Sequence, residues 1–246
     1  MAKRDTTPHI ATSGEDAMLV VEAYKKLRAN LLFSLASASK KIVLVSSPEP
    51  NVGKSTTCGN LAVMMAQTGS KVLLVDADLR KPTLHKIFHV SKSGGITRHL
   101  INLCDWEECV SKEVAPNLDL VTSGPIPPNP SELLGSARMV QFLNQAAEVY
   151  DYVIIDTPPV NVVTDGLVLA ARAAGVILLC RYNVTSYDEL QEAIDNVKNV
   201  HGNLLGVIIN DYKYTGEEKQ RRSFDKRYGY GYEYAYDYDE ETTPEV

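Results

Sequence analysis

The feature that most constrains the fold is residues 46–57, which read Ser-Ser-Pro-Glu-Pro-Asn-Val-Gly-Lys-Ser-Thr-Thr. They lie between the apolar run at residues 41–45 and a run of helical composition at residues 58–67. A strand that leads through a loop into a helix directs backbone N–H groups and the helix N-terminus toward an anion. The segment is therefore predicted to be a phosphate-binding loop, and the chain to bind a nucleoside triphosphate.

Within this loop, Lys54 is expected to reach the β- and γ-phosphates, and the Ser55 hydroxyl to hold Mg²⁺. Two positions depart from the usual pattern: Pro48 stands where a glycine is usual, and Asn51 stands where a second glycine is common. Asparagine tolerates the left-handed backbone region better than most residues, so Asn51 is physically acceptable. The predicted nucleotide-binding residues of the loop are Asn51, Val52, Gly53, Lys54, Ser55 and Thr56.

Strand-like apolar runs alternate with helix-length segments along the chain. Such alternation predicts an α/β fold of the P-loop NTPase type, with a mostly parallel central sheet and helices on both faces. Most of the runs are apolar at nearly every position, as expected for strands covered on both faces. The runs are residues 42–46, 72–76, 118–121, 152–156, 176–180 and 206–210.

Polar residues follow three of these runs: Asp76 and Asp78, then Asp156, then Asn210. Ligands of parallel sheets bind at the carboxyl ends of the strands, so these side chains are predicted to converge with the phosphate-binding loop. Phosphoryl transfer needs Mg²⁺ ligands and a group that takes the nucleophile's proton. Asp156 is the candidate Walker B acid, and either Asp76 or Asp78 is the base, the other being a magnesium partner.

The chain is predicted to have three parts. Residues 1–14 are expected to be a flexible N-terminus, residues 15–212 a single nucleotide-binding domain, and residues 213–246 a flexible tail. The domain opens with a helix over residues 15–36, which carries a stripe of apolar residues beside charged ones. Within the tail, residues 228–238 hold six tyrosines that alternate with small or acidic residues, and this segment has almost no aliphatic content to form a core.

Composition excludes several classes of protein. The net charge of −6 argues against general nucleic-acid binding. No apolar stretch approaches the roughly 18 residues that would span a bilayer, and the polar start lacks the apolar segment of a secretion signal, so a cytoplasmic protein is expected. Cys58, Cys104, Cys109 and Cys180 show no paired close spacing, which indicates reduced thiols, mostly in the core, rather than a zinc site or a disulfide framework.

Several motifs resemble those of the bacterial tyrosine kinases, in particular the capsule and exopolysaccharide type of Gram-positive bacteria. The first is Asp-Ala-Asp-Leu-Arg at residues 76–80, and the second is Asp-Thr-Pro-Pro at residues 156–159. Residues 124–134 and 163–165 are also similar to that family. The likeness runs from about residue 17 to the C-terminus. It implies an ATP- and Mg²⁺-dependent tyrosine autokinase that regulates polysaccharide polymerisation and export.

The resemblance also implies roles for individual residues. Lys54 would contact the phosphates, Ser55 and Asp78 the metal, and Asp156 would be the Walker B acid that also serves the metal. Asp76 would be the base toward a tyrosine hydroxyl, although Asp76 and Asp78 can exchange these roles. Asn210 would meet the adenine edge as in related ATPases, while a structural role in capping its strand is an equal alternative.

Further implications concern assembly and partners. In the family, the N-terminal helix packs subunits into a ring through a Glu-x-x-Arg-x-x-Arg pattern, to which Glu22, Lys25 and Arg28 correspond here. Because lysine cannot copy the bidentate grip of arginine, a weaker ring, no ring, or simply a solvated charged face is also consistent. The resemblance further implies a membrane-anchored adaptor of the polysaccharide co-polymerase type, which recruits the kinase to the inner face of the cell membrane, and a cognate tyrosine phosphatase. The predicted phosphate acceptors are Tyr228, Tyr230, Tyr232, Tyr234, Tyr236 and Tyr238.

Three other functions compete with this interpretation. A switch ATPase related to partitioning and septum-positioning proteins would carry a lysine at the position of Glu49. A small GTPase would share the string at residues 50–56, but a glycine three positions after Asp156 and an Asn-Lys-x-Asp guanine-binding motif are both missing. An inactive regulatory subunit fits the departures at Pro48 and Lys25, but the intact acidic residues oppose it.

Overall fold

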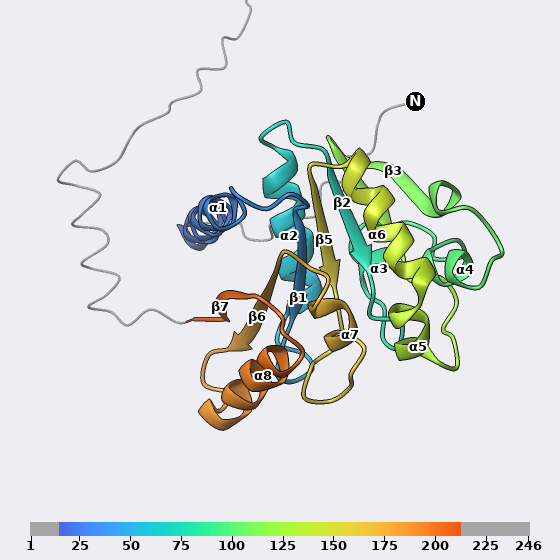
Figure 1. The fold of residues 1–246 in the computed structure, drawn as a ribbon. Helices are drawn as coiled ribbons and strands as arrows, with labels where there is room; N and C mark the ends of the chain where they lie inside the picture. Colours follow the sequence, from blue (N-terminus) through green and yellow to red (C-terminus); the bar gives the residue numbers. More distant parts are fainter. Residues whose placement is uncertain (1–14, 213–246) are drawn as a thin grey trace, which may run out of the picture. The chain divides into compact units, whose positions relative to one another are not determined.

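The computed structural model of the chain describes residues 15–212 (Figure 1). Seven strands form one sheet in the order β3-β4-β2-β5-β1-β6-β7. All neighbouring pairs run parallel except β3 and β4, which are antiparallel. The strands are β1 (Ile42–Ser46), β2 (Val72–Asp76), β3 (Val110–Ala115), β4 (Leu118–Val121), β5 (Tyr152–Asp156), β6 (Gly175–Arg181) and β7 (Leu204–Asn210).

Four strands have the predicted bounds, whereas β6 and β7 are slightly longer than the predicted runs. The prediction missed β3, because its central Lys112 and Glu113 are exposed and interrupt the apolar pattern. As the antiparallel edge strand of the sheet, β3 needs no apolar cover on both faces. At the opposite edge β7 is only partly buried, with residues of intermediate and high exposure along its length. The expectation of strands buried on both faces therefore holds for β1, β2 and β5 but not for β7.

Helices cover both faces of the sheet and create two separate cores (Figure 1). Successive side chains of a strand point to opposite faces, so in β1 Leu44 joins one core and Val43 and Val45 join the other. The core that contains Leu44 is closed by α4 to α8 and η1, and the other by α1 to α3. The helices are α1 (Glu15–Ser34), α2 (Lys54–Ala66), α3 (Leu84–Ile87), α4 (Ile96–Leu100), α5 (Pro130–Gly135), α6 (Ala137–Val149), α7 (Leu167–Ala170) and α8 (Tyr187–Asn199), with the 3-10 helix η1 (Trp106–Cys109).

The N-terminal helix begins where predicted and ends at Ser34, two residues before the expected position 36. It packs against α2, where the amide nitrogen of Asn60 donates to the Tyr24 hydroxyl at 3.2 Å. Leu31 near the end of α1, and Leu35 directly after it, are buried in the second core. Within residues 15–212, no helix is both long and apolar enough to cross a membrane.

Candidate nucleotide and metal site

The phosphate-binding loop leaves β1 and enters α2 through two left-handed residues. Asn51 has φ 62°, which confirms that asparagine accepts the conformation for which glycine is usual, and Gly53 has φ 96°. A Cβ atom at Gly53 would lie 2.4 Å from the Asn210 amide nitrogen, so a side chain there would collide as well as strain the backbone. The loop thus requires glycine immediately before Lys54, where α2 begins.

A pocket of about 540 Å³ opens over this loop and the start of α2. Its walls come from the phosphate-binding loop, the segment after β2 and the segment after β5. The lining residues are Pro50, Asn51, Gly53, Lys54, Ser55, Thr56, Asp78, Arg80, Lys81, Thr83, Ile87, Pro158, Pro159, Val162 and Val163. The carboxyl ends of β1, β2 and β5 therefore meet at one cavity, as the sequence predicted.

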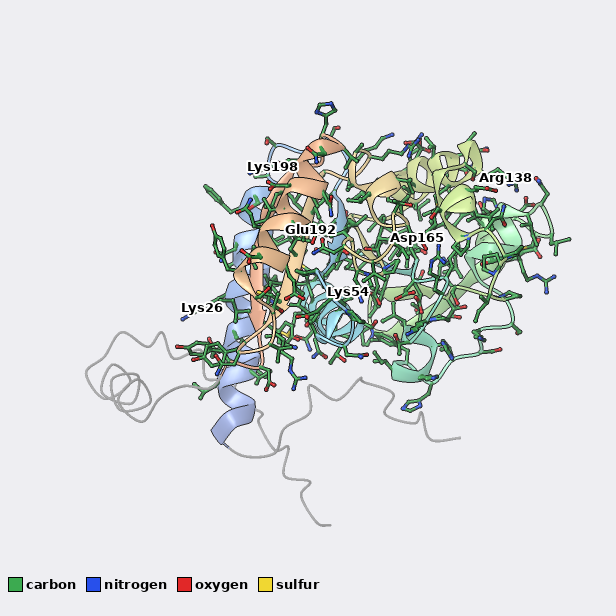
Figure 2. All side chains as sticks on the ribbon, turned by 90° about the horizontal axis from the view of Figure 1, so that it is seen from below. Lys26, Lys54, Arg138, Asp165, Glu192 and Lys198 are labelled. Carbon is green, nitrogen blue, oxygen red and sulfur yellow. The ribbon has the colours of Figure 1, made fainter. Side chains whose placement is uncertain are left out.

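Lys54 is the cation that lines the pocket at the start of α2, and Arg80 and Lys81 line it from the segment after β2. The Lys54 side chain is buried, with 8% of the residue exposed, and it forms no ion pair within the described part of the chain. Figure 2 shows Lys54 toward the middle of the molecule at the start of α2, whereas Lys26 lies at the periphery. A buried ammonium without an anionic partner is unfavourable, which a bound phosphate would relieve.

The Ser55 hydroxyl lies 2.9 Å from the Thr83 hydroxyl across the pocket. Thr83 was not among the predicted site residues, although it lies only a few positions after the Asp-x-Asp-x-Arg motif. Its backbone N–H donates to Asp76, so Thr83 connects Ser55, the serine predicted to bind the metal, to the acidic end of β2.

The two acids at the strand ends are adjacent and buried. Asp76 pairs in register with Asp156 between β2 and β5, and both residues are 0% exposed. Asp76 Oδ2 accepts from the backbone amides of Thr83 and Leu84 at 3.2 and 3.1 Å, and Asp156 Oδ1 accepts from the Cys58 thiol at 3.7 Å. Their other oxygens, Asp76 Oδ1 and Asp156 Oδ2, have no hydrogen-bond partner in the described structure.

Burial is the main cause of altered pKa values in this pair. It raises the pKa of Asp76, and the neighbouring charge of Asp156 raises it further. Burial also raises the pKa of Asp156, while Lys54 and the Ser55 hydroxyl act in the opposite direction. The influence of Lys54 and Ser55 on Asp156 places the three predicted functional groups within one electrostatic site.

Asp78 differs from both acids because it borders the pocket. Its Oδ1 accepts from the backbone amide of Lys81 at 2.9 Å, which fixes the turn after β2. Unpaired carboxylate oxygens, a serine hydroxyl and a pocket-lining carboxylate are the oxygen ligands that Mg²⁺ prefers. The residues present therefore fit a nucleotide with its magnesium ion: Lys54 and the loop amides would hold phosphates, and Ser55, Asp78 and Asp156 would hold the metal.

An ion pair at the pocket wall joins the segments after β2 and β5 to helix α5. Arg80 donates through Nε and Nη2 to both oxygens of Asp165, at 2.8 and 3.0 Å, and Ser131 donates to Asp165 Oδ1. Asp165 is fully buried, whereas the Arg80 side chain is 43% exposed. The sequence had marked the segments of these residues as similar to the kinase family but had assigned them no role. The structure brings them together.

We expect the variant Asp165→Asn to lose about 2 kcal/mol of folding free energy, because it leaves Arg80 without its bidentate partner. This value is smaller than the usual cost of breaking a buried ion pair, because the Arg80 side chain is partly exposed. This loss corresponds to a melting temperature roughly 4–8 °C lower. Calorimetry checks it, with Asp211→Asn as the matched control. In the Arg181–Asp211 pair, Nε and Nη2 of Arg181 also donate to the carboxylate, but both to Oδ2, and both side chains are more than 40% exposed. Equal losses in the two variants would contradict the prediction.

Asn210, predicted to meet adenine, uses its amide nitrogen to donate to the Val52 backbone oxygen at 2.8 Å. This contact connects the end of β7 to the phosphate-binding loop. Among the residues that the structure describes, Val52, Asp76, Asp156 and Asn210 do not border the pocket.

Glu49, at the position of the switch-ATPase lysine, accepts from the Thr185 hydroxyl.

The residues predicted for subunit contacts lie on α1 and make contacts within the chain. Lys25 and Glu22 form an ion pair of 2.7 Å, with about half of each side chain exposed. Arg28 instead donates to the backbone oxygen of Met64 in α2 at 3.1 Å, so it is directed toward its own subunit. The tyrosines predicted as acceptors, residues 228–238, lie outside the described residues.

Comparison with known proteins identifies the family of the chain. A family model described as an AAA domain matches residues 39–207. Tyrosine-protein kinase YwqD of Bacillus subtilis is 41% identical over 199 residues, which cover 81% of this chain and 84% of the relative. The putative tyrosine-protein kinase CapB of Staphylococcus aureus is 32% identical, with 88% and 99% covered. Against the putative kinase EpsB of Ralstonia solanacearum, the chain spans only 28% of the relative's length.

Solved structures give the same result. The chimerical protein CapA2B2 is 36% identical, with a TM-score of 0.75 over 79% of this chain and 86% of that one. A plasmid partition protein from Borrelia burgdorferi, 20% identical, has a TM-score of 0.55 over 75% of this chain and 87% of that one, which shows a shared fold alone. On the matched motifs, the pocket and these relatives, the chain belongs to the family of bacterial tyrosine-protein kinases.

Proposed function

We propose that the chain is an ATP- and Mg²⁺-dependent protein-tyrosine autokinase that phosphorylates the tyrosines of its own tail, one subunit acting on another. The observation that carries the proposal is that Lys54, Ser55 and Asp78 line one pocket, while the buried acids Asp76 and Asp156 lie adjacent at the ends of β2 and β5, in a chain of this family. Bound Mg²⁺ would neutralise phosphate charge and orient the transferred group.

In this proposal, the amides of the phosphate-binding loop and Lys54 hold the β- and γ-phosphates. Asp76 accepts the proton of the attacking tyrosine hydroxyl, whose ordinary pKa of about 10 makes it a poor nucleophile while neutral. The unpartnered Oδ1 of Asp76 and its raised pKa support this role. The position of Asp78 at the pocket wall supports its role as a metal ligand.

The remaining parts of the proposal rest on the family. The phosphorylated tail regulates the synthesis, polymerisation and export of a capsular or exported polysaccharide. A membrane-anchored adaptor recruits and activates the kinase at the inner face of the membrane, a phosphatase reverses the modification, and subunits assemble through α1. The Arg28–Met64 contact favours an assembly that uses Glu22 and Lys25 more than Arg28.

Mixing two defective variants tests phosphorylation between subunits. Lys54→Met retains the tail but lacks the phosphate-binding cation, and a chain truncated after Arg227 retains the site but lacks the six tyrosines. We expect intact-mass spectrometry with Mg²⁺-ATP and an adaptor's cytosolic segment to show phosphate additions on the Lys54→Met chain only in the mixture.

Wild-type protein is the positive control, and each variant alone is the negative control. If phosphate is added to the wild type but not to the Lys54→Met chain in the mixture, transfer between subunits would be refuted. No addition in any sample, with nucleotide still bound, would instead favour a switch ATPase or an inactive subunit.

A further inference from the structure

Two thiols outside the nucleotide site lie side by side. The Sγ atoms of Cys104 and Cys109 are 3.1 Å apart, although the sequence spacing had suggested no close pair. The chain turns back between them: Leu103 donates to the Arg98 backbone oxygen at 2.9 Å, and η1 then returns the chain toward α4. All four cysteines are free thiols in the structure, as the sequence indicated, but these two lie close together despite their spacing.

We propose that Cys104 and Cys109 are a modification site that forms a reversible disulfide when the protein meets a peroxide. A disulfide has an S–S length of about 2.05 Å, so the sulfurs need to approach by only about 1 Å. The side chains already face each other, and the bond would close a short segment without moving distant parts of the chain.

The surroundings hold the two thiols in place. His99 Nδ1 lies 3.2 Å from the Cys104 backbone oxygen, and Arg138 Nε donates to the His99 backbone oxygen at 3.0 Å. Between the cysteines, Trp106 is 5% exposed and packs edge-on against Phe142, with ring centroids 5.8 Å apart. The pair therefore belongs to a well-packed segment, where rigid placement favours an intramolecular reaction over one between molecules.

Differences in burial indicate which of the two cysteines reacts first with the peroxide. Cys104 is only partly buried and accessible to a small peroxide, whereas Cys109 is 4% exposed. Burial, and then the neighbouring Cys104 thiol, raises the pKa of Cys109 above the ordinary thiol value. Cys104 is therefore the thiol that meets the oxidant, and Cys109 is the one that resolves it.

The chemistry balances with hydrogen peroxide as the oxidant. The Cys104 thiolate attacks one peroxide oxygen, the O–O bond breaks, and the departing hydroxide takes a proton to become water, leaving a sulfenic acid. The Cys109 thiol then gives up its proton as its sulfur attacks the Cys104 sulfur, the S–O bond breaks, and the departing hydroxide takes that proton to leave as a second water. Two thiols lose two electrons in total, and one peroxide gains them. A small dithiol reverses the reaction by exchange.

Peroxide treatment of the full chain, followed by alkylation and peptide mapping, tests the proposal. We expect a product lighter by two hydrogens, with residues 104 and 109 joined, to form about tenfold faster than Cys58 or Cys180 is oxidised. Dithiothreitol should restore the original mass. Fluorescence of the sole tryptophan, Trp106, should change on oxidation and recover on reduction.

Two variants complete the test. Cys109→Ser should accumulate Cys104 carrying one or more oxygens, whereas Cys104→Ser should show no rapid oxidation. Cys180→Ser is the control and should behave as the wild type. The proposal is overturned if the wild type gives only oxygenated Cys104, only disulfide-linked dimers, or no oxidation faster than that of the other thiols.

Discussion

Replacing Lys54 with methionine is expected to reduce tyrosine phosphorylation about 10³-fold or more, which corresponds to about 4 kcal/mol of lost transition-state stabilisation. The physical reason is the loss of the positive charge that borders the pocket at the start of α2. Methionine keeps the length and packing of the side chain. The ammonium forms no ion pair among residues 15–212, but its charge offsets part of the rise in pKa that burial causes in Asp156, so these effects oppose each other and the nucleotide-free variant should remain folded with a stability close to that of the wild type.

Two measurements check this prediction: the initial rate of phosphate incorporation with saturating Mg²⁺-ATP, and thermal unfolding without nucleotide. Lys71→Met is the matched control, because Lys71 is exposed and precedes β2, at the end of the sheet away from the strands' carboxyl ends. The control should keep wild-type activity. A Lys54→Met protein that is inactive because it is unfolded, or that keeps more than a tenth of the activity, would contradict the assigned role.

Replacing Asp76 with asparagine is expected to change activity and stability in opposite directions. Removing the proton acceptor should lower kcat about 10²–10⁴-fold. The asparagine oxygen can still accept from the Thr83 and Leu84 amides, so the local turn has no reason to open. The metal-free variant should nevertheless be more stable than the wild type, because it buries no ionisable carboxyl beside Asp156.

The sign of the pH dependence follows from the pKa shift. Burial, followed by the Asp156 charge, raises the pKa of Asp76 in the folded chain above the unfolded value of about 4. The contribution of Asp76 to the free energy of unfolding is therefore fully present below the unfolded pKa, and it is lost as pH rises through the pKa of the folded chain. Without metal and nucleotide, the Asp76→Asn chain should exceed the wild type at pH 8 by about 2 kcal/mol, or roughly 4–8 °C, and the difference should vanish near pH 4.

Thermal unfolding in a chelator, measured across this pH range, checks the prediction, with the exposed Asp195→Asn as the control. A lower melting temperature for Asp76→Asn at pH 8 would show that the ionised carboxylate stabilises the fold. Comparison with Asp78→Asn separates the two roles. If Asp76 is the base, the acidic limb of the pH–rate profile should disappear in Asp76→Asn and persist in Asp78→Asn.

Much of the fold and of the candidate site could be predicted, because the relevant patterns are local. Four strand ranges were found from apolar runs, since parallel strands covered on both faces need apolar residues at nearly every position. The phosphate-binding loop was recognised from its order of strand, loop and helix. The convergence of Asp76, Asp78 and Asp156 followed from parallel topology alone, because all strand ends of one direction lie at one edge.

Other features could not be predicted from local patterns. The edge strand β3 carries polar residues that resemble a loop, and only pairing with β4 makes it a strand. Nothing near Arg80 in the sequence identifies Asp165 as its partner, 85 positions away. Arg28 has the spacing of a subunit contact, yet the Met64 backbone oxygen of its own chain is the group it meets.

The sequence by itself determined the class of fold, the phosphate-binding loop and the acidic strand ends, because each depends on periodicity or on a short motif whose geometry is carried by adjacent residues. Only the tertiary structure decided which acids are buried, which one borders the pocket, and which distant side chains meet, as Ser55 meets Thr83. Burial and contact depend on how all the elements pack together, and it is burial that raises the pKa values of Asp76 and Asp156.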